Sequence, residues 1–318
     1  MNTKIIVLVA LGIITFAGGY FLLSSQQTLS NIQNTVSYDN ITIEPIEHAS
    51  LVLRWDKDVL VFDPTGDADR YGDVDAVFIT DIHGDHLSTS TLQALDTEDA
   101  HLVVPQAVMD ALGGSVYFGD IEVMANGEEE PILDYTVKAV AMYNVPEAED
   151  SFHPKGRGNG YVVEKDGVRV YVAGDTGNHR LIRGLQDIDI AFVPMNEPYT
   201  MTVEDAAKVV LAFQPKIVYP YHYRGKDEYS DVEMFKQIIN RANPNIDVRL
   251  ANWYPERELG TSLIDSLPQD DTVRTEFEKA AAVGTTDSYQ VFIKSHRDHP
   301  LAKEARFELN KLRGIKNN

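Results

Sequence analysis

The chain contains no cysteine among its 318 residues, and this absence restricts its chemistry. Disulfide bonds and lipid attachment through cysteine are excluded. Any bound metal must be held by histidine, aspartate and glutamate side chains, which suit zinc, manganese or iron. Apolar residues make up 43% of the chain and charged residues 24%. These proportions are typical of a folded globular protein.

Positive charge is also scarce, because 28 lysines and arginines stand against 49 aspartates and glutamates. The resulting net charge of −21 repels phosphate backbones. Nucleic acid is therefore not expected as a partner, and a nuclease is disfavoured for the same reason.

Only one long apolar run occurs, from Ile5 to Leu23 after the basic Lys4. At about 1.5 Å per residue, this run nearly spans a bilayer core of about 30 Å. The positive-inside rule places its N-terminal end in the cytoplasm. We therefore expect residues 1–27 to form a signal anchor, with the body on the extracytoplasmic (periplasmic) face of the cytoplasmic membrane. The alternative is a cleaved signal peptide, which would give a secreted or periplasmic protein.

The remaining sequence divides into three parts. Residues 28–40 are polar and predict a linker. Residues 41–265 alternate short β-rich runs with helical stretches such as Thr202–Phe213, a texture that predicts a layered α/β sandwich. Residues 266–318 have a helical period and predict a helical hairpin.

The helical hairpin resembles a single tetratricopeptide-type unit. Its pattern includes one stripe of Tyr289, Phe292 and Ile293 and a second of Leu301, Ala305, Leu309 and Leu312. A lone unit of this kind cannot build a solenoid. The two interpretations left open are a helical pair packed on the body and a module for a protein partner or for self-association.

A dense group of metal-ligand residues follows the apolar run Val77–Ile79. It contains Asp81, His83, Asp85 and His86. Such charge is costly to bury without a compensating cation. Gly84 permits a sharp turn, through which these side chains can converge on one point.

The segment Thr80-Asp81-Ile82-His83-Gly84-Asp85-His86 resembles the Thr-His-x-His-x-Asp-His motif of the metallo-β-lactamase superfamily, with aspartate replacing one histidine. Three further segments resemble family marks in the same order: His48-Ala49-Ser50, Ala173-Gly174-Asp175-Thr176 and Pro220-Tyr221-His222. The resemblance is greatest to the branch of ascorbate-6-phosphate lactonase and N-acyl-phosphatidylethanolamine phospholipase D. It implies a four-layer αββα sandwich and a metal-dependent hydrolase.

The resemblance also implies a ligand set for one or two divalent ions. The second site would consist of Asp85, His86 and His222, with Asp175 bridging it to a first site made by Asp81 and His83. The family's third histidine for that first site would fall near Asn144, where there is none, and a loop residue, His153 or His179, could replace it. Zinc is the expected metal. The extra carboxylate of Asp81 would make its site more anionic and favour manganese or iron there.

Metal-activated water would be the nucleophile, with Asp85 or Asp175 as its proton acceptor. The expected substrate is a lactone, an amide, a phosphodiester or a lipid-derived molecule. The alternative function is a non-catalytic, metal-stabilised scaffold. Lys155 and Arg157, in a glycine-rich stretch, predict either an anion pocket or a plain exposed turn. Candidate substrate contacts or supporting residues are His48, Asn144, His153, Lys155, Arg157, Asn159, Asn196, Tyr199 and Tyr221.

Overall fold

The structure is a computed structural model that describes residues 36–254, apart from 39, 149 and 227, and part of the C-terminal region. In that region it describes residues 273, 276, 277, 279, 280, 285–296, 302, 305, 306, 309, 312 and 313.

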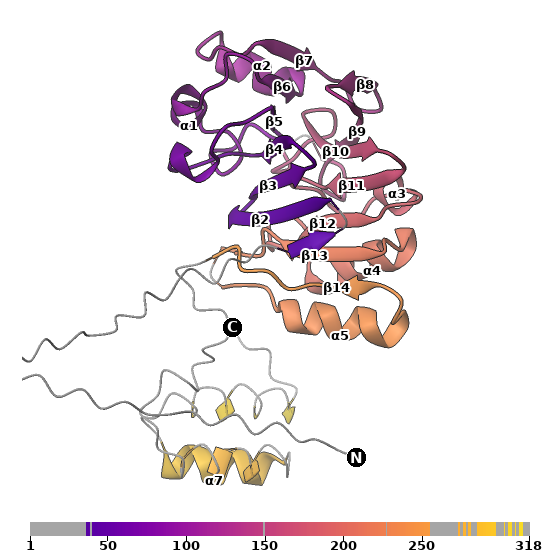
Figure 1. Cartoon of the computed structure of the whole chain (residues 1–318). Helices are drawn as coiled ribbons and strands as arrows, with labels where there is room; N and C mark the ends of the chain where they lie inside the picture. Colours follow the sequence, from indigo (N-terminus) through magenta and orange to yellow (C-terminus); the bar gives the residue numbers. More distant parts are fainter. Residues whose placement is uncertain are drawn as a thin grey trace, which may run out of the picture. The chain divides into compact units, whose positions relative to one another are not determined.

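Two seven-stranded β-sheets form the body (Figure 1). The first sheet contains, in spatial order, β1 (Val36–Tyr38), β2 (Ile41–Glu47), β3 (Ser50–Trp55), β4 (Asp58–Phe62), β5 (Ala76–Phe78), β6 (His101–Val104) and β7 (Asp120–Val123). The second contains β14 (Asp247–Val248), β13 (Ile217–Tyr221), β12 (Ile190–Pro194), β11 (Val168–Val172), β10 (Gly158–Lys165), β9 (Tyr135–Met142) and β8 (Glu129–Ile132).

Each sheet combines an antiparallel half with a parallel half. Neighbouring strands are antiparallel from β1 to β4 and from β8 to β11. They are parallel from β4 to β7 and from β11 to β14. Within each parallel half, the carboxyl ends of the strands share one edge, where open α/β sheets bind their ligands.

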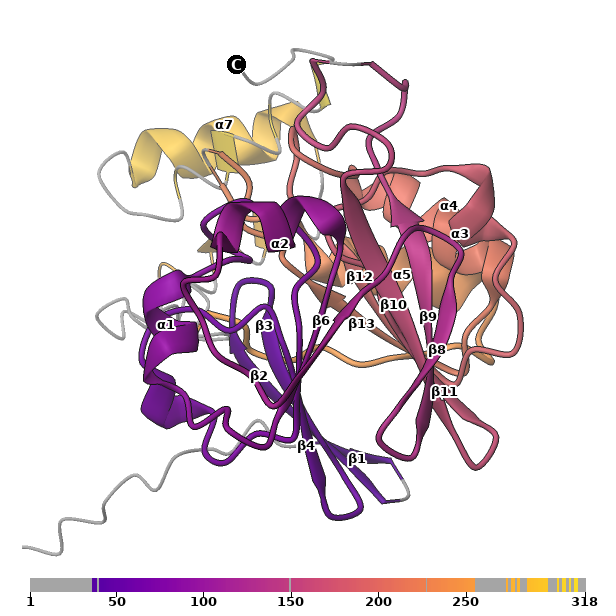
Figure 2. The same ribbon diagram turned by 90° about the horizontal axis from the view of Figure 1, so that it is seen from above.

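Helices cover the outer face of each sheet (Figure 2). They are α1 (Thr89–Ala94) and α2 (Gln106–Leu112) on the first sheet, and α3 (Arg180–Arg183), α4 (Val203–Phe213) and α5 (Val232–Ala242) on the second. Leu92 and Val108 are buried in one cluster with Val61 and Leu102. The predicted four-layer αββα sandwich is therefore confirmed.

Aromatic side chains pack between the two sheets. Phe62 and Phe78 stack with their ring centroids 4.6 Å apart, and Phe78 meets Tyr161 of the opposite sheet edge to face at 5.4 Å. The Tyr161 hydroxyl donates a hydrogen bond to the Ile79 carbonyl oxygen at 2.9 Å. This contact fixes the end of β5, after which the metal-ligand segment begins.

The described C-terminal residues include α7 (Thr286–Ser295), which begins with a capping box at Thr285. Tyr289 and Phe292 of this helix are buried in a cluster that also contains Ala305 and Leu309. The two predicted apolar stripes therefore contact each other. The likeness to a tetratricopeptide unit and the role in binding a partner stay predictions.

The predicted membrane anchor is not supported. Among the residues that the structure describes, no helix is long and apolar enough to cross a bilayer. The longest, α4 and α5, have 11 residues each, against the ~20 that a crossing helix needs. Residues 1–27, on which the prediction depended, lie outside the described residues. The anchor and the extracytoplasmic location inferred from it are withdrawn.

The packing of the hydrophobic core can be tested at Phe192, which is fully buried and stacks on Tyr219 with ring centroids 5.2 Å apart. Phe192→Ala leaves a cavity and should lower the free energy of unfolding by about 3–5 kcal/mol in urea denaturation. Tyr117→Ala is the matched control, because the Tyr117 side chain is 71% exposed. It should change stability by less than about 0.5 kcal/mol. Equal losses in the two variants would contradict the assigned core.

Candidate metal centre

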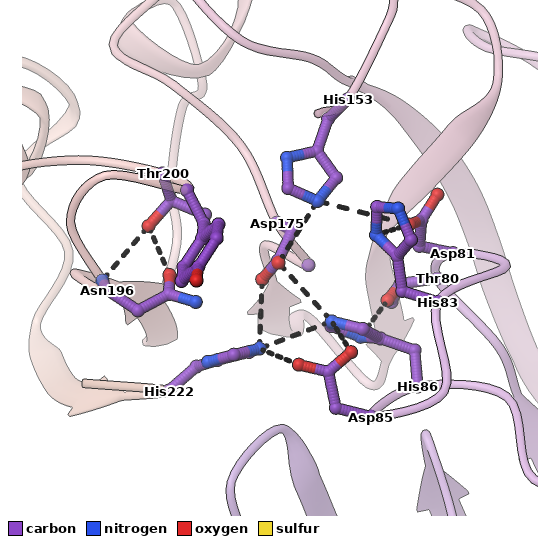
Figure 3. Close-up of polar contacts among 12 residues, drawn as sticks. Thr80, Asp81, His83, Asp85, His86, His153, Asp175, Asn196, Thr200 and His222 are labelled. Carbon is purple, nitrogen blue, oxygen red and sulfur yellow. Dashed lines mark hydrogen bonds and ion pairs between the residues drawn. The ribbon is translucent and has the colours of Figure 1, made fainter. Parts of the chain in front are cut away.

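The segment after β5 folds into a tight turn that divides its ligands between two sides (Figure 3). The backbone N–H groups of His86 and Leu87 donate to the His83 carbonyl oxygen at 2.9 and 2.8 Å. Asp81 and His83 then lie on one side of the centre, and Asp85 and His86 on the other.

The second site brings together Asp85, His86 and His222, as the sequence predicted. His222 Nε2 lies 3.2 Å from His86 Nε2 and 3.4 Å from Asp85 Oδ2. His222 directly follows β13 and adopts a φ of +47°. This left-handed conformation is uncommon for residues other than glycine and is characteristic of functional sites.

The first site is completed by His153, one of the two loop histidines that the sequence offered. Asp81 Oδ2 lies 2.7 Å from His83 Nδ1 and 3.9 Å from His153 Nε2. Asn144 stands where the family histidine was expected and orients its replacement. Its Oδ1 accepts from the His153 backbone N–H at 2.8 Å and lies 3.2 Å from the ring Nδ1.

His179, the other candidate, is held elsewhere. It stacks on Tyr143 with ring centroids 4.0 Å apart, and its Nε2 lies 3.0 Å from Thr176 Oγ1. Among the described residues, the three groups able to hold a metal do not include His179.

Asp175 lies between the two sites. Its Oδ2 is 3.2 Å from His153 Nε2 and 3.4 Å from His86 Nε2, and its Oδ1 is 3.2 Å from His222 Nε2. The preceding Gly174 has a φ of +63°, and a Cβ there would lie 2.9 Å from the Thr80 side chain. Only glycine therefore permits this close approach of the second sheet to the first.

The donor atoms fit divalent ions. His153 Nε2 and Asp175 Oδ1 are buried without a hydrogen-bond partner among the described residues. Buried polar atoms rarely lack partners, and a cation would satisfy both. Each site offers two imidazoles and one carboxylate of its own and shares Asp175. Such nitrogen and oxygen donors suit zinc, manganese and iron.

Electrostatics keeps the carboxylates ionised for this role. Burial opposes ionisation of Asp85, but hydrogen bonds from His222 and His48 hold the pKa of Asp85 far below its ordinary value. Burial likewise opposes ionisation of Asp175, but the neighbouring His222 and His86 lower the pKa of Asp175 well below its ordinary value. Both carboxylates are therefore charged at neutral pH and available as ligands.

The expectation of an unusually anionic first site is wrong, because Arg157 balances Asp81. The guanidinium Nε and Nη2 donate to the two Asp81 carboxylate oxygens, each at 3.0 Å. This bidentate pair removes the net charge that aspartate would add in place of histidine. The two sites are thus equivalent in donor type.

The predicted anion pocket at Lys155 and Arg157 does not form. Arg157 is occupied by Asp81, and Lys155 Nζ lies 3.1 Å from Glu147 Oε1. Asn159 is also structural, because its buried amide donates to the Met124 carbonyl oxygen. Tyr221 supports the bridging residue, since its hydroxyl accepts from the Gly174 N–H at 2.8 Å.

Two supporting residues, Asp63 and Thr80, were not identified as site residues from the sequence. Asp63 Oδ2 lies 2.7 Å from His86 Nδ1 and also accepts from the Thr80 hydroxyl at 2.6 Å. A carboxylate on the outer nitrogen orients a ligand histidine and makes it more basic. The sequence feature that could have identified Asp63 is its position, because it is an acidic residue directly after the buried strand β4.

A cavity of about 290 Å³ opens on the centre. Its lining includes the predicted residues His48, His83, Asp85, His153, Asp175, Asn196 and Tyr199. Phe152 and Arg224 also line it and were not predicted. His48 Nε2 lies 3.3 Å from Asp85 Oδ2. Burial and the neighbouring His222 lower the pKa of His48 to about 4, so that its ring is neutral at pH 7.

An αββα sandwich with candidate histidine and aspartate ligand groups at its strand ends is the arrangement of a metal-dependent hydrolase. The model of the β-lactamase superfamily domain matches residues 42–222, and the chain belongs to this family. A UPF0173 metal-dependent hydrolase of Staphylococcus carnosus is 31% identical over 185 residues, covering 55% of this chain and 79% of that protein. Another, of Pyrococcus horikoshii, is 28% identical over 214 residues, covering 63% and 92%.

Two solved structures are similar to this chain. The crystal structure of a metal-dependent hydrolase from Parabacteroides distasonis has a TM-score of 0.60 and 36% identity, covering 68% of this chain and 96% of that one. Igni18, a metallo hydrolase from Ignicoccus hospitalis, has a TM-score of 0.57 at 21% identity, covering 67% and 95%, and shows the shared fold. The protein is a metal-dependent hydrolase that acts on a small molecule. The lactonase-like branch assignment stays a prediction.

The ligand assignment predicts the effect of His153→Ala on metal content. Removing this imidazole leaves the first site one donor short, so bound metal should fall from about two ions to about one per chain in elemental analysis. His101→Ala is the control, because His101 lies on β6 outside the candidate ligand groups. Two ions retained in His153→Ala would contradict the first site.

Proposed function

We propose that this hydrolase uses two divalent ions, zinc or alternatively manganese or iron, to cleave a lactone, an amide, a phosphodiester or a lipid-derived substrate. The observation that carries the proposal is the pair of equivalent ligand groups on either side of Asp175. His83 and His153 with Asp81 would hold one ion. His86 and His222 would hold the other together with Asp85, whose Oδ2 lies 3.4 Å from His222 Nε2.

When bound, such ions lower the pKa of water toward neutrality and polarise a carbonyl or phosphoryl oxygen. The chain's own residues would orient the water, accept its proton and bridge the ions. The Asp85 side chain is 39% exposed and lines the cavity, whereas that of Asp175 is 4% exposed. We therefore assign Asp85 to orient the nucleophilic water and accept its proton, and Asp175 to bridge the ions.

His48 would assist beside Asp85. Its Nδ1 lies 2.6 Å from the Tyr254 hydroxyl, which leaves Nε2 directed at Asp85. The φ of His48 is +55°, so the backbone holds this ring in an uncommon conformation beside the cavity. A neutral imidazole there can bond the water or the substrate oxygen.

The cavity supports catalysis over a metal-stabilised scaffold. A structural metal site is closed by protein ligands, whereas a catalytic site keeps a position open to substrate. Here the ligands His83, Asp85 and Asp175 themselves line a cavity of about 290 Å³. That volume suits a small molecule or one reactive group of a larger one.

The test is the double variant His86→Ala/His222→Ala, measured for metal content and for turnover on a panel of lactone, amide, ester and phosphodiester substrates. Loss of both imidazoles should remove the second ion and lower kcat at least about a thousandfold. His101→Ala again serves as the control. Retention of both metal and turnover in the double variant would refute the proposed centre.

A further inference from the structure

Arg224 is the one lysine or arginine among the residues that line the catalytic cavity. It follows the ligand His222 by two positions, in a chain whose net charge is −21. A cation kept at this place in such a chain will attract negatively charged groups into the cavity. The role of Arg224 could not be predicted from the sequence, because the residues around it come from distant segments.

The guanidinium of Arg224 is available to a ligand. Within the described part of the chain, no carboxylate forms an ion pair with it. The nearby cations differ: Arg157 is bidentate on Asp81, and Lys155 is paired with Glu147. Arg224 is also exposed at the cavity, so an incoming anion need not displace a protein partner.

The structure holds Arg224 in place from two directions. Its backbone N–H donates to the Tyr254 hydroxyl at 3.1 Å, and its guanidinium carbon lies 5.7 Å from the centre of the Tyr254 ring. The same hydroxyl lies 2.6 Å from His48 Nδ1, and His48 in turn reaches Asp85. Tyr254 therefore links the arginine, through His48, to the second metal site.

The loop that carries Arg224 is packed against another wall of the cavity. The Gly225 N–H donates to the Glu228 carbonyl oxygen at 2.8 Å. A Cβ on Gly225 would lie only 2.5 Å from the Glu197 carbonyl oxygen. This close approach fixes the loop against the segment that contributes Asn196 and Tyr199 to the lining.

An aromatic surface completes the cavity. Phe152 is 51% exposed, and its ring meets that of Tyr199 edge to face at 5.0 Å. Both side chains line the same cavity as Arg224. Exposed Phe152 and half-buried Tyr199, beside a guanidinium that has no carboxylate partner among the described residues, can bind a molecule that carries an apolar part and an anionic part.

We propose that Arg224 determines specificity by binding an anionic group of the substrate, a carboxylate or a phosphate, close to the bond that is hydrolysed. Phe152 and Tyr199 bind the apolar part of the same molecule. This inference rests on the proposed hydrolytic function and narrows its substrate class. The negative charge belongs to the substrate itself, and Arg224 takes no part in bond cleavage.

The first experiment compares a matched ester pair, phenyl propanoate and phenyl hydrogen succinate, which differ by one carboxylate. The ratio of kcat/KM for the anionic ester to that for the neutral ester should fall about tenfold in metal-loaded Arg224→Gln, as expected for one charged hydrogen bond. Arg224→Lys should restore part of the ratio, and the control Lys155→Gln should retain it. An unchanged ratio in Arg224→Gln would overturn the proposal.

A second measurement needs no turnover. Calorimetric titration of the metal-loaded full chain with inorganic phosphate should give a dissociation constant about tenfold weaker in Arg224→Gln than in the unaltered chain. Equal affinities, or no binding by the unaltered chain, would refute the role of Arg224. Failure of the chain to hydrolyse either ester while this difference in phosphate affinity remains would instead count against the proposed hydrolytic function alone.

Discussion

The position of Asp175 between two imidazole groups is the constraint on which the rest of the molecule depends. Its carboxylate approaches His86 from the first sheet, His222 from the second and His153 from a loop. These residues can meet only where strand ends of both sheets converge. Aromatic side chains pack between the two sheets, and the glycine before Asp175 lets the strand ends approach each other closely.

The charge balance around Asp175 explains several other features. Buried carboxylates and imidazoles at these distances need cations or hydrogen bonds to offset their desolvation. Asp63 supplies a hydrogen-bonding carboxylate to the outer face of His86, and Arg157 neutralises Asp81. An aspartate in place of a histidine is thus tolerated because a cation from another loop accompanies it.

Much of the fold and of the second site was predictable from the sequence, since both depend on local patterns. His222 stands directly after β13, Asp175 shortly after β11, and Asp85 and His86 in the turn that follows β5. Parallel strands bring such positions to one edge of a sheet. The predicted helical stretch Thr202–Phe213 is likewise found as α4, and the Thr202 side chain accepts a hydrogen bond from the Asp205 N–H at its start. The membrane anchor, by contrast, is not supported, since no helix among the described residues is long and apolar enough to cross a bilayer.

The first site was only half predictable. His153 occupies a loop, and neither its distance from Asp81 nor its support by Asn144 follows from spacing along the chain. The pairing of Arg157 with Asp81 could not be predicted either, because 76 residues separate the two in the sequence. The position of Arg224 at the cavity depends on its contact with Tyr254, which is 30 residues away in the sequence. The position of His153, the pairing of Arg157 and the contact of Arg224 all depend on tertiary contacts between loops.

Anomalous diffraction from crystals of the natively purified protein, recorded at the absorption edge of its metal, tests the central claim most directly. The account predicts two peaks. One should lie among Asp81, His83 and His153 and the other among Asp85, His86 and His222, with the Asp175 carboxylate touching both. A single peak at the second site, with Arg157 and Asp81 still paired beside an empty first site, would contradict the account.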